Sequence, residues 1–310
     1  MANIISRPDW YIPDSQVTPE HAYRNRRDFL KKAGFLGAAA LMSQAMNAQA
    51  ENSLYPAKRS GIHNPGWRLT DEEVATSYNN FYEFTTRKTG VKDLVGLFNT
   101  SPWEVKVGGL CEKPASFDVD GLSRQMGLEE RVYHFRCVEA WAMTVPWTGF
   151  PLAKLLRKVQ PKPEARFVKF VTAFKQDEMP GVVRLPDYPW PYTEGLRMDE
   201  AMHDLTMVVT GIYGKPLPKQ NGAPIRIVVP WKYGYKSIKS IVSIELVKEQ
   251  PKTLWETLSP EEYPFESNVE PEVPHPRWSQ ATHRIVDTGE RVRTLPYNGY
   301  ANQVARLYKK

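Results

Sequence analysis

Short runs of strand-like sequence, with no long helices between them, are the feature that most limits how this chain can fold. The runs are rich in β-branched and aromatic residues and end at glycine, proline or asparagine. They cover residues 103–107, 117–122 (a strand that turns into a helix start), 132–138, 167–171, 206–213, 225–229 and 240–247. Because these strands do not alternate with long helices, the sequence predicts a mixed, loop-rich α+β domain rather than a doubly wound parallel sheet.

The predicted helices are few and short. Residues 151–159 place four apolar side chains on one helical face after a proline. Thr70, followed three positions later by Glu73, has the pattern of a capping box and predicts a helix that ends near residues 78–84. Gly108 and Gly109 predict a turn, residues 51–70 an entry arm, and residues 301–308 a closing helix.

Two adjacent arginines near the start of the chain indicate an export signal. Arg26-Arg27-Asp28-Phe29-Leu30-Lys31-Lys32 precedes a weakly apolar run, residues 33–42, and the small-residue triplet Ala48-Gln49-Ala50. This order is typical of a twin-arginine signal peptide. A membrane span needs about 20 apolar residues, and glycines interrupt this run. We therefore expect a signal peptide at 1–50, cleaved after Ala50 or Ala48, and a mature domain at 51–310 that folds around a cofactor before export.

Charge and cysteine content exclude several classes of protein. The formal net charge of +6 comes from interspersed charges of both signs, without the basic tract of a nucleic-acid binder. The sequence contains no Gly-x-Gly-x-x-Gly or P-loop pattern, so a dinucleotide or nucleoside triphosphate is not indicated. An oxidising compartment favours a disulfide between Cys111 and Cys137. Cys137, however, lies in an apparent strand core, and we expect both cysteines to be free, with Cys111 structural.

Four segments carry more polar residues than a simple core requires: 79–83, 136–141, 220–226 and 231–240. Each has an ordinary structural explanation when it is taken alone. An Asn-Gly pair marks a turn, lysines solvate a surface, and a single cysteine is usually a small buried apolar residue. Together, and behind an export signal for folded proteins, they suggest one cofactor site.

The chain resembles the catalytic subunits of bacterial periplasmic protein-methionine-sulfoxide reductases, which are molybdenum enzymes with the sulfite-oxidase fold. The resemblance covers roughly residues 60–310 and rests on long strings. They are 78–84, Arg136-Cys137-Val138-Glu139-Ala140-Trp141, 145–151, 220–224, Val229-Pro230-Trp231-Lys232-Tyr233-Gly234, 275–280 and 297–301. Residues 176–190 match only loosely, and we expect them to form part of the substrate rim.

The resemblance implies one molybdopterin without an attached nucleotide, holding one molybdenum. Cys137 matches the residue that ligates the metal. A thiolate is a strong donor to a high-valent metal, and coordination removes the proton of the thiol. The residues that match cofactor-binding positions are Asn79, Tyr82, Glu83, Cys137, Thr172, Asn221, Arg226, Ser237, Ile238 and Lys239. Arg226 and Lys239 would supply cationic donors for the pterin phosphate.

Glu139 is our candidate for a catalytic carboxylate that handles protons at the metal. It lies two residues after Cys137, and in extended backbone the two side chains share a face. The alternative is a surface carboxylate.

The resemblance also implies the reaction, which is the reduction of methionine sulfoxide residues in oxidised periplasmic proteins. The sequence has no haem-binding Cys-x-x-Cys-His motif and no flavin motif. The electrons are therefore expected from a separate protein, and the resemblance implies that this protein is a membrane haem-binding subunit that uses quinol. The alternatives that remain open are a reductase of small S- or N-oxides, a sulfite oxidase-like enzyme and a cofactor-free binding module.

Overall fold

The computed structural model describes residues 54–60 and 67–309, and the statements below concern these residues. The predicted signal peptide at 1–50 lies outside them. Among the described residues, no helix is long and apolar enough to cross a membrane. Strands of two mixed sheets, together with short helices, confirm the predicted α+β class.

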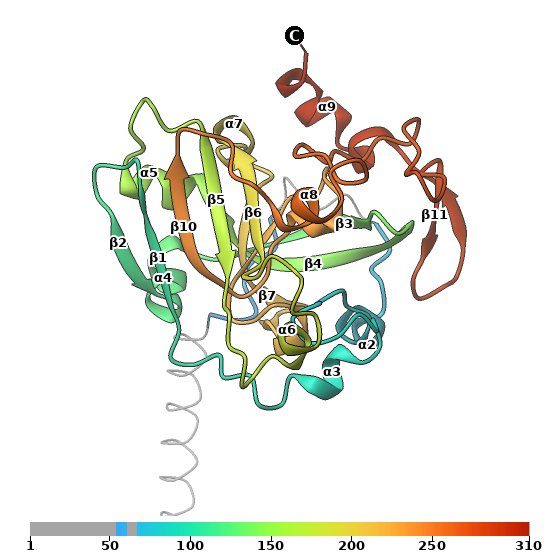
Figure 1. Ribbon diagram of the computed structural model, residues 1–310, viewed down its shortest axis with the longest axis horizontal. Helices are drawn as coiled ribbons and strands as arrows, with labels where there is room; N and C mark the ends of the chain where they lie inside the picture. The colour runs from blue at the N-terminus through green and yellow to red at the C-terminus, as the bar shows by residue number, and fades with distance from the viewer. Residues whose placement is uncertain (1–53, 61–66, 310) are drawn as a thin grey trace, which may run out of the picture. The chain divides into compact units, whose positions relative to one another are not determined.

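The first sheet has five strands in the order β2-β1-β10-β5-β6, seen upright in Figure 1. Its strands are β1 (Glu104–Gly109), β2 (Ala115–Asp118), β5 (Phe167–Thr172), β6 (Thr193–Arg197) and β10 (Ile241–Val247). Only the β1–β10 pair is parallel. Strand β5 buries every second residue, which is the alternation that the sequence predicts for a sheet with one covered face.

The second sheet has seven strands, and in Figure 1 its strands β3 and β4 run across the first sheet. Its strands are β3 (Glu129–Cys137), β4 (Trp141–Pro151), β7 (Met207–Ile212), β8 (Lys215–Pro216), β9 (Arg226–Val228), β11 (Thr282–Ile285) and β12 (Arg291–Arg293). Strand β4 lies at the centre. It pairs antiparallel with β3 and β7 and parallel with β11.

Every residue of β4 is buried, which explains why the sequence analysis did not find this strand. A strand covered on both faces shows no polar–apolar alternation. Pro146 and Gly149, which are more typical of loops, also weaken the strand pattern in the sequence. The β4–β7 pair shifts its register between Thr148 and Gly149, where a Cβ on Gly149 would lie only 2.0 Å from the carbonyl oxygen of Val208.

The helices are short and lie between strands. They are α2 (Glu72–Ser77), α3 (Val91–Leu94), α4 (Val119–Met126), α5 (Leu152–Val159), α6 (Pro180–Arg184), α7 (Met198–Ala201), α8 (Leu254–Leu258) and α9 (Ala301–Val304). The 3-10 turns are η2 (Lys219–Asn221), η3 (Gly234–Lys236), η4 (Pro296–Gly299) and η5 (Ala305–Leu307). Helix α5 buries Leu152, Leu155, Leu156 and Val159 as the 3.6-residue period predicts.

Two local predictions are wrong. Helix α2 is capped by Asp71, whose carboxylate accepts from the backbone N–H of Glu73 and Val74, and not by Thr70. The Thr70 hydroxyl instead accepts from the backbone N–H of Thr144, 2.9 Å away. The predicted turn at Gly108 and Gly109 is the end of β1, which continues its pairing with β10.

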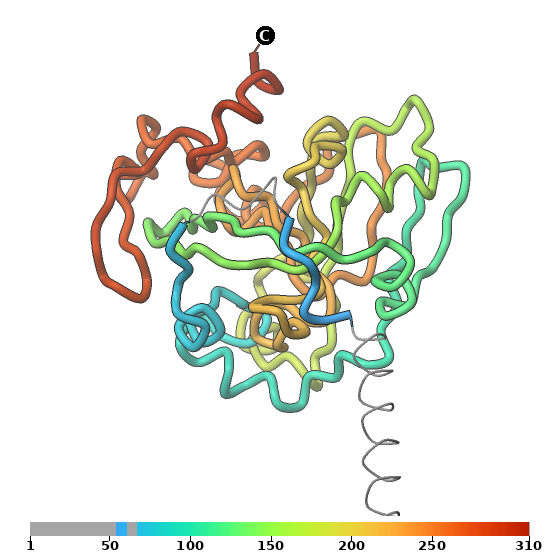
Figure 2. Tube along the Cα trace, turned by 180° about the vertical axis from the view of Figure 1, so that it is seen from behind, coloured from blue at the N-terminus to red at the C-terminus, as the bar shows by residue number. Residues whose placement is uncertain are grey.

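The described entry arm, residues 54–60, crosses the second sheet, and it is the blue segment in Figure 2. The Tyr55 hydroxyl donates to the carbonyl oxygen of Thr210 at 2.8 Å. Arg59 forms an ion pair with Glu130 at 2.6 Å and a parallel bridge to the same residue. The arm is therefore joined to strands β3 and β7.

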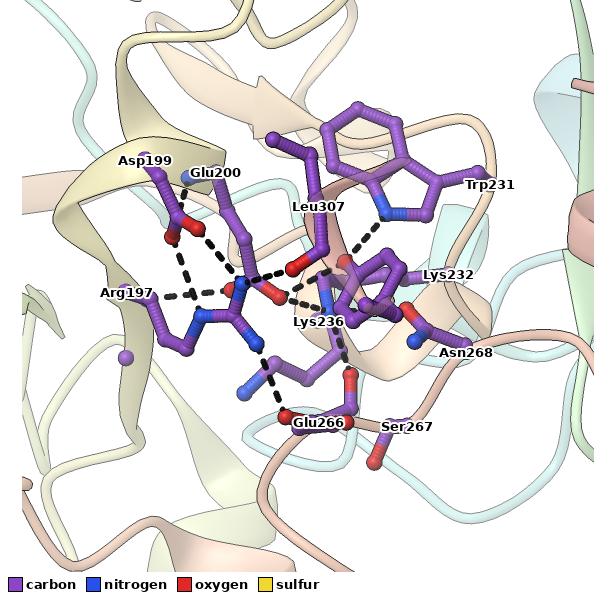
Figure 3. A network of polar contacts seen from close by, with 12 residues as sticks. Arg197, Asp199, Glu200, Trp231, Lys232, Lys236, Glu266, Ser267, Asn268 and Leu307 are labelled. Atoms are coloured by element: carbon purple, nitrogen blue, oxygen red, sulfur yellow. Dashed lines mark hydrogen bonds and ion pairs between the residues drawn. The ribbon is translucent and has the colours of Figure 1, made fainter. Parts of the chain in front are cut away.

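A buried polar network joins the end of the chain to α7 (Figure 3). Lys232 Nζ lies 2.6 Å from Glu200 Oε1, and both side chains are almost fully buried. The Tyr308 hydroxyl donates to the same carboxylate at 2.7 Å, and Trp231 Nε1 donates to that hydroxyl at 2.8 Å. Arg197 donates to the carbonyl oxygen of Leu307 at 2.8 Å. Residues far apart in the sequence therefore share one desolvated charge cluster.

Candidate active site

One cavity, with ≈ 960 Å³ of empty space, collects most of the residues predicted to bind the cofactor. Its walls come from the loop after α2, the ends of β3 and β5, and the segments around η2 and η3. The predicted residues that line it are Asn79, Tyr82, Glu83, Cys137, Glu139, Thr172, Asn221, Arg226, Ile238 and Lys239. Ser237 does not line the cavity. Its carbonyl oxygen accepts from Arg226 Nη2 at 2.9 Å, so it positions that guanidinium.

Cys137 is the last residue of β3, and its side chain faces the cavity. The backbone then turns instead of continuing as a strand. Ala140 has φ 60, and its N–H donates to the carbonyl oxygen of Cys137 at 3.1 Å. The prediction that extended backbone places Glu139 beside Cys137 is therefore wrong in its geometry. The turn nevertheless brings Glu139 Oε2 to 3.7 Å from the Cys137 sulfur.

Arg136 stabilises this turn from behind. One guanidinium nitrogen, Nη1, donates to the carbonyl oxygen of Cys137, and Nη2 donates to Gln280 Oε1 at 2.7 Å. Gln280 in turn donates to the carbonyl oxygen of Val138 at 2.8 Å. Arg136 and Gln280 belong to strings quoted for the resemblance, but their sequence gave no sign of this role. They hold the backbone of the two peptide groups that follow the thiol.

The Glu139 carboxylate is surrounded by donors. Its Oε2 accepts from Asn80 Nδ2 at 3.0 Å and from Trp141 Nε1 at 3.1 Å, and it lies 2.9 Å from Lys88 Nζ. Burial raises the pKa of Glu139, but these hydrogen bonds and the Lys88 charge outweigh it and lower the pKa overall. The carboxylate is therefore ionised at neutral pH.

Asn80 was missed by the sequence analysis, although it directly follows Asn79. Its amide nitrogen lies 3.3 Å from the Cys137 sulfur as well as 3.0 Å from the Glu139 carboxylate. Two adjacent asparagines give no sequence signal that distinguishes the one facing the thiol. The structure makes Asn80 a bridge between the thiol and the carboxylate.

The thiol of Cys137 is neutral in the protein alone. Burial, and then the charge of Glu139, raise its pKa to about 12. A high-valent metal would displace this proton, as metals do with coordinating thiols. Within the described residues no group of three histidine, cysteine or acidic side chains converges, and Cys137 is the thiol among the residues that line the cavity. Both Cys137 and Cys111 are free, as expected.

Two cations line the cavity, Arg226, which is buried, and Lys239, which is partly buried. Arg226 donates to the carbonyl oxygens of Asn221 and Ser237 at 2.8 and 2.9 Å, and burial lowers its pKa to about 9. Burial, and then repulsion from Arg226, lower the pKa of Lys239 to about 7. Burial raises the pKa of Glu83 to about 7 against the attraction of Lys239. An anion placed here would stabilise the charged forms of both bases.

The backbone near Lys239 is held closely. Thr172 Oγ1 donates to the carbonyl oxygen of Lys239 at 2.8 Å. Gly222 has φ 95, and a Cβ there would lie 2.7 Å from Cβ of Lys239, so only glycine fits without strain. The predicted Asn-Gly turn at 221–222 is thus the surface on which Lys239 packs.

The cavity fits a pterin with a phosphate and one metal. Asn79 Oδ1, Asn80 Oδ1 and Asn221 Oδ1 are buried and have no hydrogen-bond partner among the described residues. Buried polar groups without partners are costly, so a polar ligand is expected to satisfy such atoms. The unpartnered amides, the two cations and the single thiol form a donor set suited to that cofactor.

Comparison with known proteins identifies the family of the chain. Residues 93–255 match the model of the oxidoreductase molybdopterin binding domain family. The protein-methionine-sulfoxide reductase catalytic subunit MsrP of Xanthomonas axonopodis pv. citri is 49% identical and covers 96% of this chain and 95% of that protein. MsrP of Campylobacter jejuni is also 49% identical and covers 94% of this chain and 97% of that protein. The chain belongs to the family of protein-methionine-sulfoxide reductase catalytic subunits.

MsrP of Ralstonia nicotianae is a further relative, 46% identical over 96% of this chain and 93% of its own. Among solved structures, the sulfane dehydrogenase SoxCD of Paracoccus pantotrophus aligns with a TM-score of 0.42 and 17% identity over 62% of this chain and 56% of that one. That likeness is too low to bear on fold or function. Membership of the MsrP family confirms the predicted resemblance, while the roles of individual residues stay predictions.

Proposed function

We propose that this protein reduces methionine sulfoxide residues in other proteins at a molybdenum carried by molybdopterin. The observation that carries the proposal is the position of the Cys137 thiol on the wall of a cavity that also holds Arg226 and Lys239. One thiol for the metal and two cations for a phosphate are what such a cofactor requires. The relatives named as methionine sulfoxide reductases support the choice of substrate.

The overall reaction takes a sulfoxide, two electrons and two protons to a thioether and water. When bound, the metal would supply the two-electron exchange and accept the oxygen. Cys137 would hold the metal. Asn80 would fix the positions of the Cys137 sulfur and the Glu139 carboxylate relative to each other, because its amide contacts both. The ionised Glu139 would accept protons, and Lys88 beside it would donate them, at the edge of the cavity that opens to solvent.

The electron donor must be a separate protein, because the sequence has no haem-binding or flavin motif. The relatives are named as catalytic subunits, which implies a partner subunit. We place the enzyme in the periplasm, with a membrane haem-binding subunit fed by quinol as that partner. The twin arginines at 26 and 27 support this location.

Metal analysis combined with a substrate panel tests the proposal. Protein matured in the cytoplasm is expected to contain about one molybdenum per chain and to reduce protein-bound methionine sulfoxide with an artificial electron donor. Free methionine sulfoxide, dimethyl sulfoxide, an N-oxide and sulfite complete the panel. A preference for small S- or N-oxides, dominant sulfite oxidation or the absence of molybdenum would each overturn the proposed function.

A further inference from the structure

A second, wider hollow adjoins the cavity and shares lining residues with it, and most of its lining has no role in the proposed reaction. We call this hollow the vestibule. The vestibule has ≈ 1160 Å³ of empty space and is open to solvent. Aromatic side chains, among them Tyr82, Trp255 and Tyr263, line it beside Glu139. Tyr188 is the contribution of the segment predicted to form the substrate rim. Because the vestibule is open to solvent and shares Glu139 and several aromatic side chains with the cavity, the residues on either side of a methionine sulfoxide in a polypeptide would also lie here.

The charges of the vestibule do not balance. Lys88, Arg277, Arg284 and Arg291 line it, and Glu139 is the acidic residue among the lining side chains. Lys88 is paired with Glu139 at 2.9 Å. Arg277 is paired with Glu262, which lies 2.6 Å from its guanidinium. The cationic excess therefore resides on Arg284 and Arg291.

Arg284 and Arg291 lie directly opposite each other on neighbouring antiparallel strands, β11 and β12. Like charges at such positions destabilise a strand pair. Arg284 contacts Tyr78 Oη at 3.4 Å, and Arg291 donates to Thr282 Oγ1 at 3.1 Å. No carboxylate in the described part of the chain forms an ion pair with either arginine. A bound anion between them would offset their repulsion.

These two arginines also stand close to the reactive turn. The backbone N–H of Arg284 donates to the carbonyl oxygen of Ala140 at 3.0 Å, and Arg284 is in register with Trp141 of β4. A polypeptide rises about 3.3 Å per residue when it is extended. Because Arg284 pairs with the segment that follows Cys137, a residue within a few positions of the sulfoxide would lie beside the arginine pair while the sulfoxide enters the cavity.

We propose that Arg284 and Arg291 form a subsite for an aspartate or glutamate side chain that flanks the methionine sulfoxide in the substrate polypeptide. The inference rests on the proposed function and adds a substrate preference to it. A guanidinium matches a carboxylate with two parallel hydrogen bonds, and a pair of arginines attracts the acidic segment before it docks.

The test compares three synthetic peptides of equal length, each with one methionine sulfoxide flanked by aspartate, glutamine or lysine. Holoenzyme is assayed with an artificial electron donor at low and high salt. At low salt kcat/KM is expected to be roughly threefold to tenfold higher for the aspartate peptide than for the glutamine peptide, with the lysine peptide lowest. The preference is expected to shrink as salt rises, because Arg291 is exposed and Arg284 is only partly buried.

Variants at position 291 assign the preference to the subsite. Arg291→Gln is expected to bring the ratio of kcat/KM for the aspartate peptide to kcat/KM for the glutamine peptide close to one. Arg291→Lys is expected to keep most of the preference for aspartate. Arg291→Glu is expected to favour the lysine peptide. Arg293→Gln is the matched control, since Arg293 lies on the same strand but does not line the vestibule. It is expected to leave the ratio and the turnover within about twofold of the wild type.

The outcomes separate the two proposals. If no methionine sulfoxide peptide is turned over, the proposed function fails. If all three peptides are reduced with equal kcat/KM by the wild type, or if Arg291→Gln retains the full preference for aspartate, the subsite is wrong while the function stands.

Discussion

The two cysteines of this chain are both buried and free, yet only Cys137 faces the cavity. Cys111 instead forms an isolated bridge with Pro161 through its backbone. Burial keeps the Cys137 thiol protonated until a metal replaces the proton, so the residue is inert toward disulfide exchange before the cofactor arrives. The same desolvation that hides the thiol therefore preserves it for metal binding.

Substitution of the two cysteines should consequently have opposite outcomes. Cys137→Ser is expected to reduce methionine sulfoxide reduction by at least about a hundredfold and to lower the molybdenum content, because an alcohol is a poor soft ligand. Cys111→Ser is expected to keep both within about twofold. Metal analysis and turnover of the purified variants measure this. Equal losses from both substitutions would instead favour a disulfide in the exported protein.

His134 provides a pH-dependent test at the same scale. Its ring stacks on Trp67 with centroids 3.6 Å apart, and Nδ1 lies 2.8 Å from Thr144 Oγ1. Burial lowers the pKa of His134 to about 4. The folded protein thus keeps the ring neutral at pH values where the unfolded chain, with a pKa near 6.5, takes up a proton. Stability from this residue is complete above pH 6.5 and falls as the pH drops toward 4.

Lowering the pH from 7 to 5 should therefore decrease the free energy of unfolding, and about 1–2 kcal/mol of that decrease should come from His134. Urea unfolding at pH 7 and at pH 5 measures this change in the free energy of unfolding. His134→Asn removes the titrating ring, so the loss between pH 7 and 5 is expected to be smaller by that amount, whatever its effect at pH 7. If His134→Asn and the wild type lost the same free energy of unfolding between pH 7 and pH 5, a neutral, buried His134 would be excluded.

At the scale of elements, the sequence predicts best where periodicity reflects one covered face. Helix α5 and strand β5 were predicted because their apolar residues recur at helical and strand periods. Strand β4 was missed because it is buried on both faces, and the short strand β11 because its pairing with β4 is a contact between distant residues. The wrong cap of α2 has a local cause, since Thr70 and Asp71 are both good capping residues.

The site shows the same division. Residues in recognisable strings were predicted together. Ser237 was expected to contribute its backbone near the phosphate, and its carbonyl oxygen accepts from Arg226 Nη2 at 2.9 Å. Asn80 and Lys88 were missed because their role arises only when the chain brings them to Glu139. A turn, rather than a strand, at Val138–Ala140 could not be foreseen without the contacts of Arg136 and Gln280.

The Lys232–Glu200 pair makes a prediction about elements, because it joins the loop after β9 to α7. Lys232→Ala is expected to lower the free energy of unfolding by about 3–5 kcal/mol, since it leaves the Glu200 carboxylate buried without its cation. Lys232→Met with Glu200→Gln is expected to recover a large part of that loss. Chemical denaturation of the three proteins measures the effect.

An exposed ion pair serves as the control. Lys215 lies 2.8 Å from Glu72, and both side chains are largely exposed to solvent. Lys215→Ala is expected to change the free energy of unfolding by less than about 1 kcal/mol. A loss at Lys232 no larger than the loss at Lys215 would show that the buried pair is not desolvated in solution.

At the scale of the whole molecule, the residues of the site come from segments that lie far apart in the sequence, and this decides when the site can form. The cavity draws on the loop after α2, the ends of β3 and β5, and the segments around η2 and η3, so both sheets must be formed before it exists. A cofactor would then bind only to folded protein, and its binding would stabilise that state by mass action. This dependence gives a physical reason for a route that exports folded chains.

The twin arginines can therefore be tested together with cofactor loading. Arg26→Lys with Arg27→Lys is expected to keep nearly all of the full-length protein in the cytoplasm, while its molybdenum content and its activity in extracts match the wild type. Arg24→Lys, a change of the same kind just before the pair, is expected to leave export within about twofold of the wild type. Cell fractionation followed by metal analysis of each pool measures both. Export of the double variant at the wild-type level, or wild-type protein that reaches the periplasm without molybdenum and acquires it there, would contradict the order of folding, cofactor binding and export.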